Sequence, residues 1–108
     1  MRILRVDGLP AEPLAAASLF HQHWLAHVEE KLGEDDVMVA LDLADHRHRD
    51  WRRALARDLA RKHTPRRVNL VTGDDAVVAA FAAYLENAPG ITGQYFEGDG
   101  HGAGDPAK

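Results

Sequence analysis

The chain has 108 residues, and its 45% hydrophobic and 28% charged residues are typical of one soluble globular domain rather than of a disordered chain. It contains no cysteine, which excludes disulfides and thiolate chemistry. There is no apolar run of about 18 residues and the first residues do not resemble a signal peptide, so we expect a cytoplasmic protein without a membrane segment.

The net charge of −4 conceals an uneven distribution of charge along the chain. Residues 46–67 carry nine Lys/Arg and two acidic residues, whereas the remaining residues carry four basic and fifteen acidic ones. This segment could be a basic patch for an anionic ligand, although a solvated helix face or a contact with the acidic block would explain it too. No aromatic stacking platform accompanies it, so we do not expect nucleic-acid binding. The candidate patch residues are Arg47, Arg49, Arg52, Arg53 and Arg57.

The first half of the chain alternates between strand and helix patterns. Residues 2–6 predict a short strand that ends at the Asp7-Gly8 turn. A helix is then expected to end at Gly33, followed by a buried strand over 37–43 and a second helix over 46–63. The inner face of the first helix is predicted to carry Leu14, Ala17, His21, Trp24, Leu25, Val28 and Leu32. That of the second is predicted to carry Trp51, Ala54, Leu55 and Leu59.

The second half continues the same alternation. Pro65 ends the second helix, and residues 67–71 predict a third strand that ends in a glycine turn. Asp74 is the expected N-cap of a third helix with Val77, Val78, Phe81, Tyr84 and Leu85 on its inner face. Residues 91–96 predict a fourth strand. The order βαβαβαβ predicts an α/β domain over residues 1–97 with four mainly parallel strands, in two or three layers, and a glycine-rich tail over 98–108.

The handedness of the connections raises a question about the second face of this sheet. If the strands lie in sequential order and every crossover is right-handed, all three helices cover the same face. Each large apolar side chain left in water on the other face would forfeit about 1.5–3 kcal/mol. We therefore expect either that one helix lies on the opposite face or that another chain covers it.

Three stretches of the sequence resemble the second half of the short-chain dehydrogenase/reductase family. They are ALARDLA at 54–60 followed by RRVN at 66–69, VNLVTG at 68–73, and ITGQ at 91–94 followed by Phe96, Asp99 and Gly100. In the second stretch Thr72 replaces a proline of the family, and in the third Gly98 and His101 replace a valine and a glycine. The resemblance implies a half-Rossmann fold, with residues 2–8 in place of the family's fourth strand.

The residues that perform the family's chemistry are missing. Its enzymes use a tyrosine with a lysine four residues on, because the lysine lowers the tyrosine pKa. Tyr84 and Tyr95 are instead followed at that spacing by Ala88 and Asp99, and the aligned catalytic positions are Leu41 and Asp45. The single serine, Ser18, falls on the first helix. We therefore predict no catalytic residues.

A site for the family's dinucleotide cofactor is missing too. A cofactor loop must follow the first strand and open a helix, but only one glycine, Gly8, stands there. Gly93, Gly98 and Gly100 imitate a phosphate loop, yet no helix can follow them, so we interpret them as a closing strand and its turn. We therefore predict neither catalysis nor a bound cofactor.

Seven histidines raise the question of a metal site. His23 and His27, four residues apart on one helix, could share an ion, whereas His21 and His23 point apart. Asp45, His46 and His48 are flanked by arginines that disfavour a cation. Because no third ligand is evident, we predict no metal and keep His23 and His27 as the weak candidates.

The resemblance implies that the first two helices form a subunit interface, and the interface candidates are Leu19, Phe20, Trp24, Trp51 and Leu55. We thus expect a non-catalytic domain that acts as a homo-oligomer or as an accessory subunit of a full-length relative. A reductase completed by a partner that supplies NAD(P) and the tyrosine is one alternative. A basic module for an anionic ligand is another.

Overall fold

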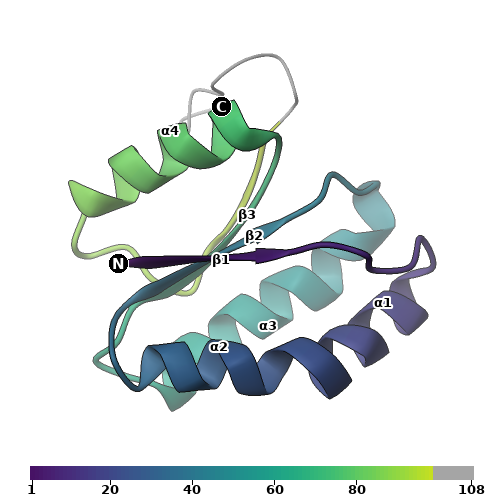
Figure 1. The fold of residues 1–108 in the computed structure, drawn as a ribbon, viewed down its shortest axis with the longest axis horizontal. Helices are drawn as coiled ribbons and strands as arrows, with labels where there is room; N and C mark the ends of the chain where they lie inside the picture. Colours follow the sequence, from purple (N-terminus) through teal and green to yellow (C-terminus); the bar gives the residue numbers. More distant parts are fainter. Residues whose placement is uncertain (99–108) are drawn as a thin grey trace.

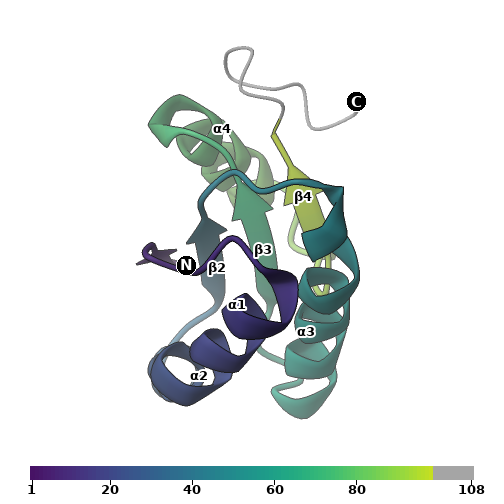
Figure 2. The same cartoon turned by 90° about the vertical axis from the view of Figure 1, so that its right-hand side faces the viewer.

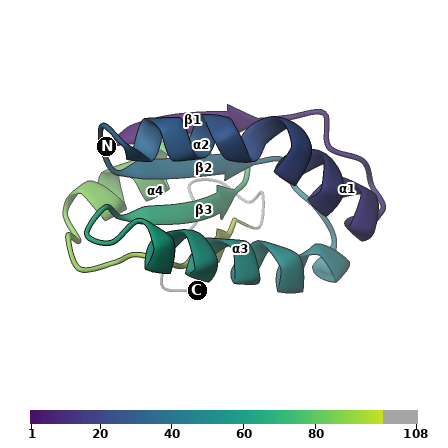
Figure 3. The same ribbon diagram turned by 90° about the horizontal axis from the view of Figure 1, so that it is seen from below.

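A computed structural model describes residues 1–98 of the chain, which form one sheet of four parallel strands in the order β1-β2-β3-β4. All neighbouring strands are parallel, and Figure 3 shows β1, β2 and β3 pointing in the same direction. Arg2, Val37 and Val68 stand level with one another at their amino ends. The predicted α/β class and the parallel half-Rossmann sheet are confirmed. The strands are β1 (Arg2–Val6), β2 (Val37–Leu41), β3 (Val68–Thr72) and β4 (Tyr95–Glu97).

Helices cover both faces of the sheet and give the domain three layers. The long helix after β1 comprises α1 (Pro13–Leu19), a π-helical segment (Phe20–Trp24) and α2 (Leu25–Leu32); the other helices are α3 (Arg49–Lys62), preceded by a 3-10 turn (His46–His48), and α4 (Asp75–Glu86). Figure 1 shows α1, α2 and α3 on one face and α4 alone on the other. Within residues 1–98, no helix combines the length and the apolar character needed to cross a bilayer.

The position of α4 decides how the second face of the sheet is covered. The first two crossovers are right-handed, and all three advance along the sheet in the same direction (Figure 2). Since α4 lies on the opposite face, the β3-α4-β4 crossover is left-handed, against a strong general preference. Val77, Val78, Phe81 and Leu85 of α4 form a separate core with Met38 and other residues of that face. The structure thus takes the first of the two expected solutions, in which one helix changes face.

The π-helical segment changes which residues of the long helix face the sheet. In a regular α-helix Ala16 and Leu32 would lie about 160° apart around the axis. Both are nevertheless buried, as is Phe20, because the wider turn compensates for this drift. The prediction that Leu14 and His21 face inward was therefore wrong: Leu14 is 80% exposed, and His21 is exposed too.

The fourth strand begins later than predicted, at Tyr95 rather than at Ile91. The preceding loop is held by Asn69, which is buried, donates to the Ile91 carbonyl at 3.1 Å and accepts from the Gln94 N–H at 3.1 Å. Gly98, assigned to the tail by the sequence, is buried and donates its N–H to the Thr72 carbonyl at 2.8 Å. The folded part therefore includes Gly98, and the rest of the expected tail lies outside the described residues.

One edge of the sheet is β1, which pairs with β2 alone among the described strands. Its side chains are mostly exposed, including Ile3 at 51%. Arg2 forms an ion pair with Glu34 at 2.9 Å, and Arg5 forms one with Asp75. This edge therefore carries two charged side chains on a short strand.

Candidate functional site

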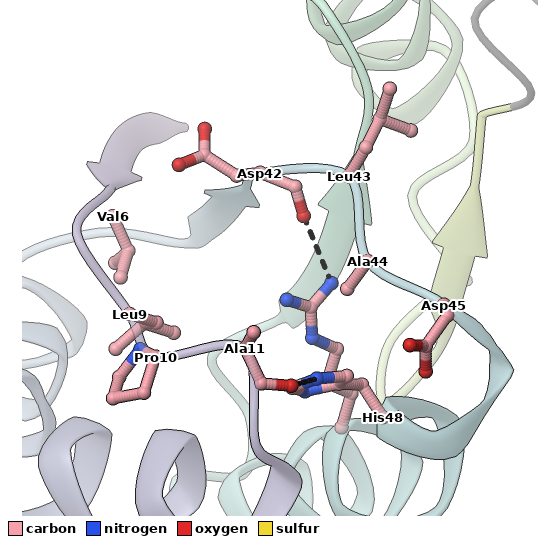
Figure 4. Close-up of a pocket in the computed structure, with 10 residues that line it drawn as sticks. Val6, Leu9, Pro10, Ala11, Asp42, Leu43, Ala44, Asp45 and His48 are labelled. Carbon is pink, nitrogen blue, oxygen red and sulfur yellow. Dashed lines mark hydrogen bonds between the residues drawn. The ribbon is translucent and has the colours of Figure 1, made fainter.

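A pocket of about 390 Å³ opens where β1 and β2 end, as Figure 4 shows. Segments after parallel strands meet at the carboxyl edge of a sheet, which is where open α/β sheets usually bind ligands. The pocket is bounded by the loop after β1, the loop after β2 and the start of α3. It is lined by Val6, Leu9, Pro10, Ala11, Asp42, Leu43, Ala44, Asp45, His48 and Arg52.

His48 forms one wall of the pocket and is 3% exposed. Its Nε2 lies 2.9 Å from the Ala11 carbonyl oxygen, and its Nδ1 lies 3.0 Å from the indole nitrogen of Trp51. A carbonyl can only accept and an indole N–H can only donate, so Nε2 carries the proton and Nδ1 accepts. His48 is thus a neutral imidazole that fixes the loop after β1 against α3.

Arg52 lines the pocket and is 2% exposed. Its Nη1 donates to the Asp42 carbonyl at 3.2 Å and to the Tyr95 hydroxyl at 3.1 Å. The guanidinium carbon lies 5.5 Å from the ring centroid of Trp51 and 5.7 Å from that of Tyr95. Its Nε is buried and has no hydrogen-bond partner. The prediction that Arg52 belongs to a surface patch was therefore wrong.

The burial of Arg52 could have been predicted from its spacing to apolar residues in the sequence. Arg52 stands three, four and seven residues before Leu55, Ala56 and Leu59, all of which are buried. This spacing places it on the inner face of α3. Because arginine is charged, it was instead predicted to face solvent.

Gly93 and Gly98 flank β4, so the predicted closing strand lies between them and is shorter than expected. Gly93 donates its N–H to the Val68 carbonyl at 2.8 Å, and Gly98 donates to Thr72. A phosphate loop needs N–H groups that are free to point at the anion. The N–H groups of Gly93 and Gly98 already donate to carbonyls and are not free to bind an anion. Gly100 lies beyond the part of the chain that the structure describes.

The comparison with protein families agrees with this architecture. The model of a family described as short chain dehydrogenase-like protein matches residues 4–98, nearly the whole described domain. The chain belongs to this family. No curated protein and no solved structure matches it significantly.

The dinucleotide cofactor that the dehydrogenase resemblance implies does not fit the helix ends of this chain. The Glu12 carboxylate accepts from the N–H groups of Leu14 at 2.9 Å and Ala15 at 3.0 Å, at the start of α1. Asp45 and Asp74 cap the 3-10 turn and α4 in the same way. Each of these ends thus carries a carboxylate at the position where a pyrophosphate would have to bind.

The positions that align with the catalytic pair of the dehydrogenases have structural roles. Leu41 is fully buried in β2, and Asp45 accepts hydrogen bonds from Arg47, which lower the Asp45 pKa to about 2. Burial raises the pKa of the Tyr95 phenol, despite the opposing effect of Arg52. Proton exchange near neutral pH needs the opposite shift. Ser18 lies exposed on α1, where its hydroxyl accepts from Gln22 at 3.5 Å.

The remaining patch residues do not form one surface of free cations. Arg47 pairs with Asp45 at 3.0 Å, and Arg49 pairs with Glu97 at 2.6 Å. Arg53 and Arg57 have no ion pair within residues 1–98 and line a hollow of about 430 Å³ beside β4. Several charges of the basic segment are therefore compensated inside the chain.

The predicted interface residues separate into two groups. Phe20 and Leu55 are 0% and 5% exposed and belong to the core, so they were wrong as surface contacts. Leu19, Trp24 and Trp51 are partly exposed. Figure 3 shows α1–α2 and α3 lying side by side on this face. Between α2 and α3 runs a groove of about 280 Å³, lined by His21, Leu25, Glu29, Trp51, Ala54, Leu55, Asp58, Leu59 and Lys62.

The metal candidates lie at one side of this face. His23 and His27 are exposed and line a hollow of about 300 Å³ with Leu19 and Trp24. The part of the chain covered by the structure contains no cluster of three metal-ligating side chains. His27 instead packs edge-on against the Trp24 ring, with centroids 6.2 Å apart.

Glu29 joins α2 to the end of α3, and its removal should have a pH-dependent effect. Its carboxylate lies 2.6 Å from Lys62 Nζ and 2.7 Å from His63 Nε2, which lower its pKa below the usual 4.5. A lowered folded-state pKa stabilises the protein above about pH 4.5, and this contribution is lost as the pH falls through the folded value. We expect Glu29→Gln to lower the free energy of unfolding by about 0.5–1 kcal/mol at pH 7.

Urea unfolding at several pH values would test this prediction. The loss caused by Glu29→Gln should shrink as the pH falls below 4.5 and through the lowered pKa of Glu29. Glu30→Gln is the matched control, because Glu30 is exposed and has no ion pair among the described side chains. A loss that does not change with pH would contradict an electrostatic role for Glu29.

Proposed function

We propose that this chain is a non-catalytic short-chain dehydrogenase-like domain that assembles through α1–α2 and α3, as a homo-oligomer or as an accessory subunit of a full-length relative. The observation that carries the proposal is the groove between α2 and α3, where the apolar surface of Leu25, Trp51 and Ala54 is only partly covered. Burial of such surface in a partner is favourable at about 25 cal/mol per Å².

The charges around the groove favour a second copy as the occupant. One rim carries Glu29 and the other carries Asp58 and Lys62, so both signs of charge are present. A twofold axis places the same patch on both sides of an interface. Asp58 of one copy can then meet Lys62 of the other, which its ion pair with Glu29 holds at the rim. A full-length relative would use its own two helices in the same way.

The lack of catalysis is supported by the residues that replace the family's chemistry. Leu41 and Asp45 stand at the aligned catalytic positions, and Glu12 occupies the helix end after β1. We expect no turnover of NAD(P)-dependent substrates by the purified chain. Turnover that appears only when a full-length dehydrogenase is added would instead favour the partner-completed reductase.

Light scattering after size-exclusion chromatography at micromolar concentration tests the assembly. We expect the wild-type chain to elute as a dimer or larger oligomer. Ala54→Arg places a long charged side chain in the groove and should give a monomer with an unchanged circular dichroism spectrum. Ala83→Arg, on the exposed side of α4, is the control and should leave the oligomer intact.

If the wild-type chain elutes as a monomer, the homo-oligomer is excluded and only the role of accessory subunit remains. In that case the chain must form a stable complex with a full-length dehydrogenase of the same cell, and Ala54→Arg must weaken it. Failure of both assemblies would overturn the proposal.

A further inference from the structure

The guanidinium of Arg52 lies in the pocket at the carboxyl edge of the sheet without a counterion. Arg52 is 2% exposed, yet within residues 1–98 it takes part in no ion pair with a carboxylate. The Asp42 carbonyl and the Tyr95 hydroxyl, its two acceptors, are both neutral and both bind Nη1. A buried cation of this kind carries an uncompensated desolvation cost.

The unused part of the guanidinium has the shape of an anion receptor. Nη1 already donates twice, whereas Nε is buried without a partner and Nη2 makes no hydrogen bond to the described residues. Nε–H and Nη2–H lie on the same edge of the planar group. Nε is covered by the protein, whereas Nη2 is free to donate a charge-assisted hydrogen bond to a carboxylate or a phosphate. Arg52 lines the pocket together with Leu9, Pro10 and Ala11.

The walls of the pocket select among anions. Val6, Leu9 and Pro10 form an apolar side of the pocket (Figure 4). Asp42 and Asp45 add negative charge to the lining, and the neighbouring helix end carries Glu12. These carboxylates disfavour a second negative charge on the ligand, as in phosphate.

We propose that this pocket binds a small monocarboxylate. Its carboxylate accepts from Nη2 of Arg52, and its apolar body packs against Val6, Leu9 and Pro10. The site is separate from the proposed assembly groove, and its test does not depend on the oligomeric state. The ligand also gives the chain a recognition role that requires no reaction.

Titration of the full chain with sodium butyrate, followed by ¹H–¹⁵N NMR, tests the proposal. We expect saturable shifts of the Ala11 and Ala44 amides and of the Trp51 indole N–H, which donates to His48. Butyramide has the same shape without the charge, and inorganic phosphate has more charge without the apolar body. Each should bind at least about tenfold more weakly, because charge-assisted hydrogen bonds contribute about 1.5–3 kcal/mol. Equal shifts with butyrate and butyramide, or no saturable shifts, would overturn the proposal.

Three variants locate the anion. Arg52→Met keeps the length of the side chain and should weaken butyrate binding by at least about tenfold, whereas Arg53→Met, at an exposed position of the same helix, should leave binding unchanged. Asp42→Asn removes an exposed carboxylate from the rim and should strengthen binding about twofold to fivefold.

Asp42→Asn keeps the test decisive should Arg52→Met fail to fold, because the Asp42 side chain lies outside the core. A decrease in butyrate affinity, or none of the expected increase, would then overturn the site. So would unchanged binding by a folded Arg52→Met variant.

Discussion

Replacement of Gly98 by alanine is expected to lower the free energy of unfolding by about 2–3 kcal/mol. A Cβ at this position would lie 2.4 Å from Val77 Cγ1 and 2.7 Å from the Thr72 carbonyl oxygen. Neither neighbour can move easily, because Val77 is a β-branched residue in α4 and Thr72 belongs to β3. Urea unfolding followed by circular dichroism measures the loss.

Gly90→Ala is the control for Gly98→Ala. A Cβ at Gly90 would have no heavy atom within 4 Å, and the Gly90 backbone does not have a positive φ. Its replacement should change the stability by less than about 0.5 kcal/mol. Similar losses in the two variants would show that close packing is not the reason for a glycine at position 98.

Phe81→Ala is expected to cost about 3–4 kcal/mol, because it opens a cavity in the core beneath α4. Phe81 is 3% exposed and stacks on Phe96 of β4, with ring centroids 5.1 Å apart. Since α4 is the only described helix on this face, no neighbouring helix can close the gap. Chemical denaturation would give the total loss, and amide hydrogen exchange should show the largest loss of protection in β4.

Tyr84→Ala, one turn along α4, provides the comparison. The Tyr84 side chain is 40% exposed and meets Phe96 only edge-on, at 6.2 Å. Its loss should cost less than about 1 kcal/mol. Equal destabilisation by the two substitutions would mean that α4 is not held by the buried aromatic contact.

The strand cores and most helix ends could be predicted from the sequence, because they depend on local chemistry. Residues 37–41 are apolar throughout and form a strand buried on both faces. Gly33 follows α2 at its carboxyl end, and Asp74 caps α4 by accepting from the Val77 N–H at 2.9 Å. In each case a few neighbouring residues determine the outcome.

The side of the sheet taken by α4 could not be predicted in this way. The amphipathic pattern of α4 is the same whichever face it covers, and the general preference for right-handed crossovers gives the wrong face. Which residues of the long helix face the sheet depends on a π-helical turn at Phe20–Trp24, which an apolar sequence pattern does not predict. Both features arise from packing between distant segments.

The candidate site shows the same division. The loops after β1 and β2 follow from the parallel order of the strands, so a pocket at this edge is an expected consequence of the fold. The burial of Arg52 is not an expected consequence of the fold, because arginine is rarely buried without an ionic partner. Only the contacts with Asp42 and Tyr95, ten and 43 residues away in sequence, show how this cation is held.

The charged side chains of β1 affect how readily this strand edge can pair with another chain. A parallel sheet that stops at β1 leaves a row of backbone groups able to pair with any extended chain, which is a common origin of aggregates. Arg2 and Arg5, each in an ion pair with an acidic side chain, act there as gatekeepers, since a second strand placed alongside would have to accommodate these charged groups. Neutral residues at positions 2 and 5 would leave Ile3 and Leu4 on an unguarded edge. These charged side chains therefore disfavour pairing of the β1 edge with a second extended chain.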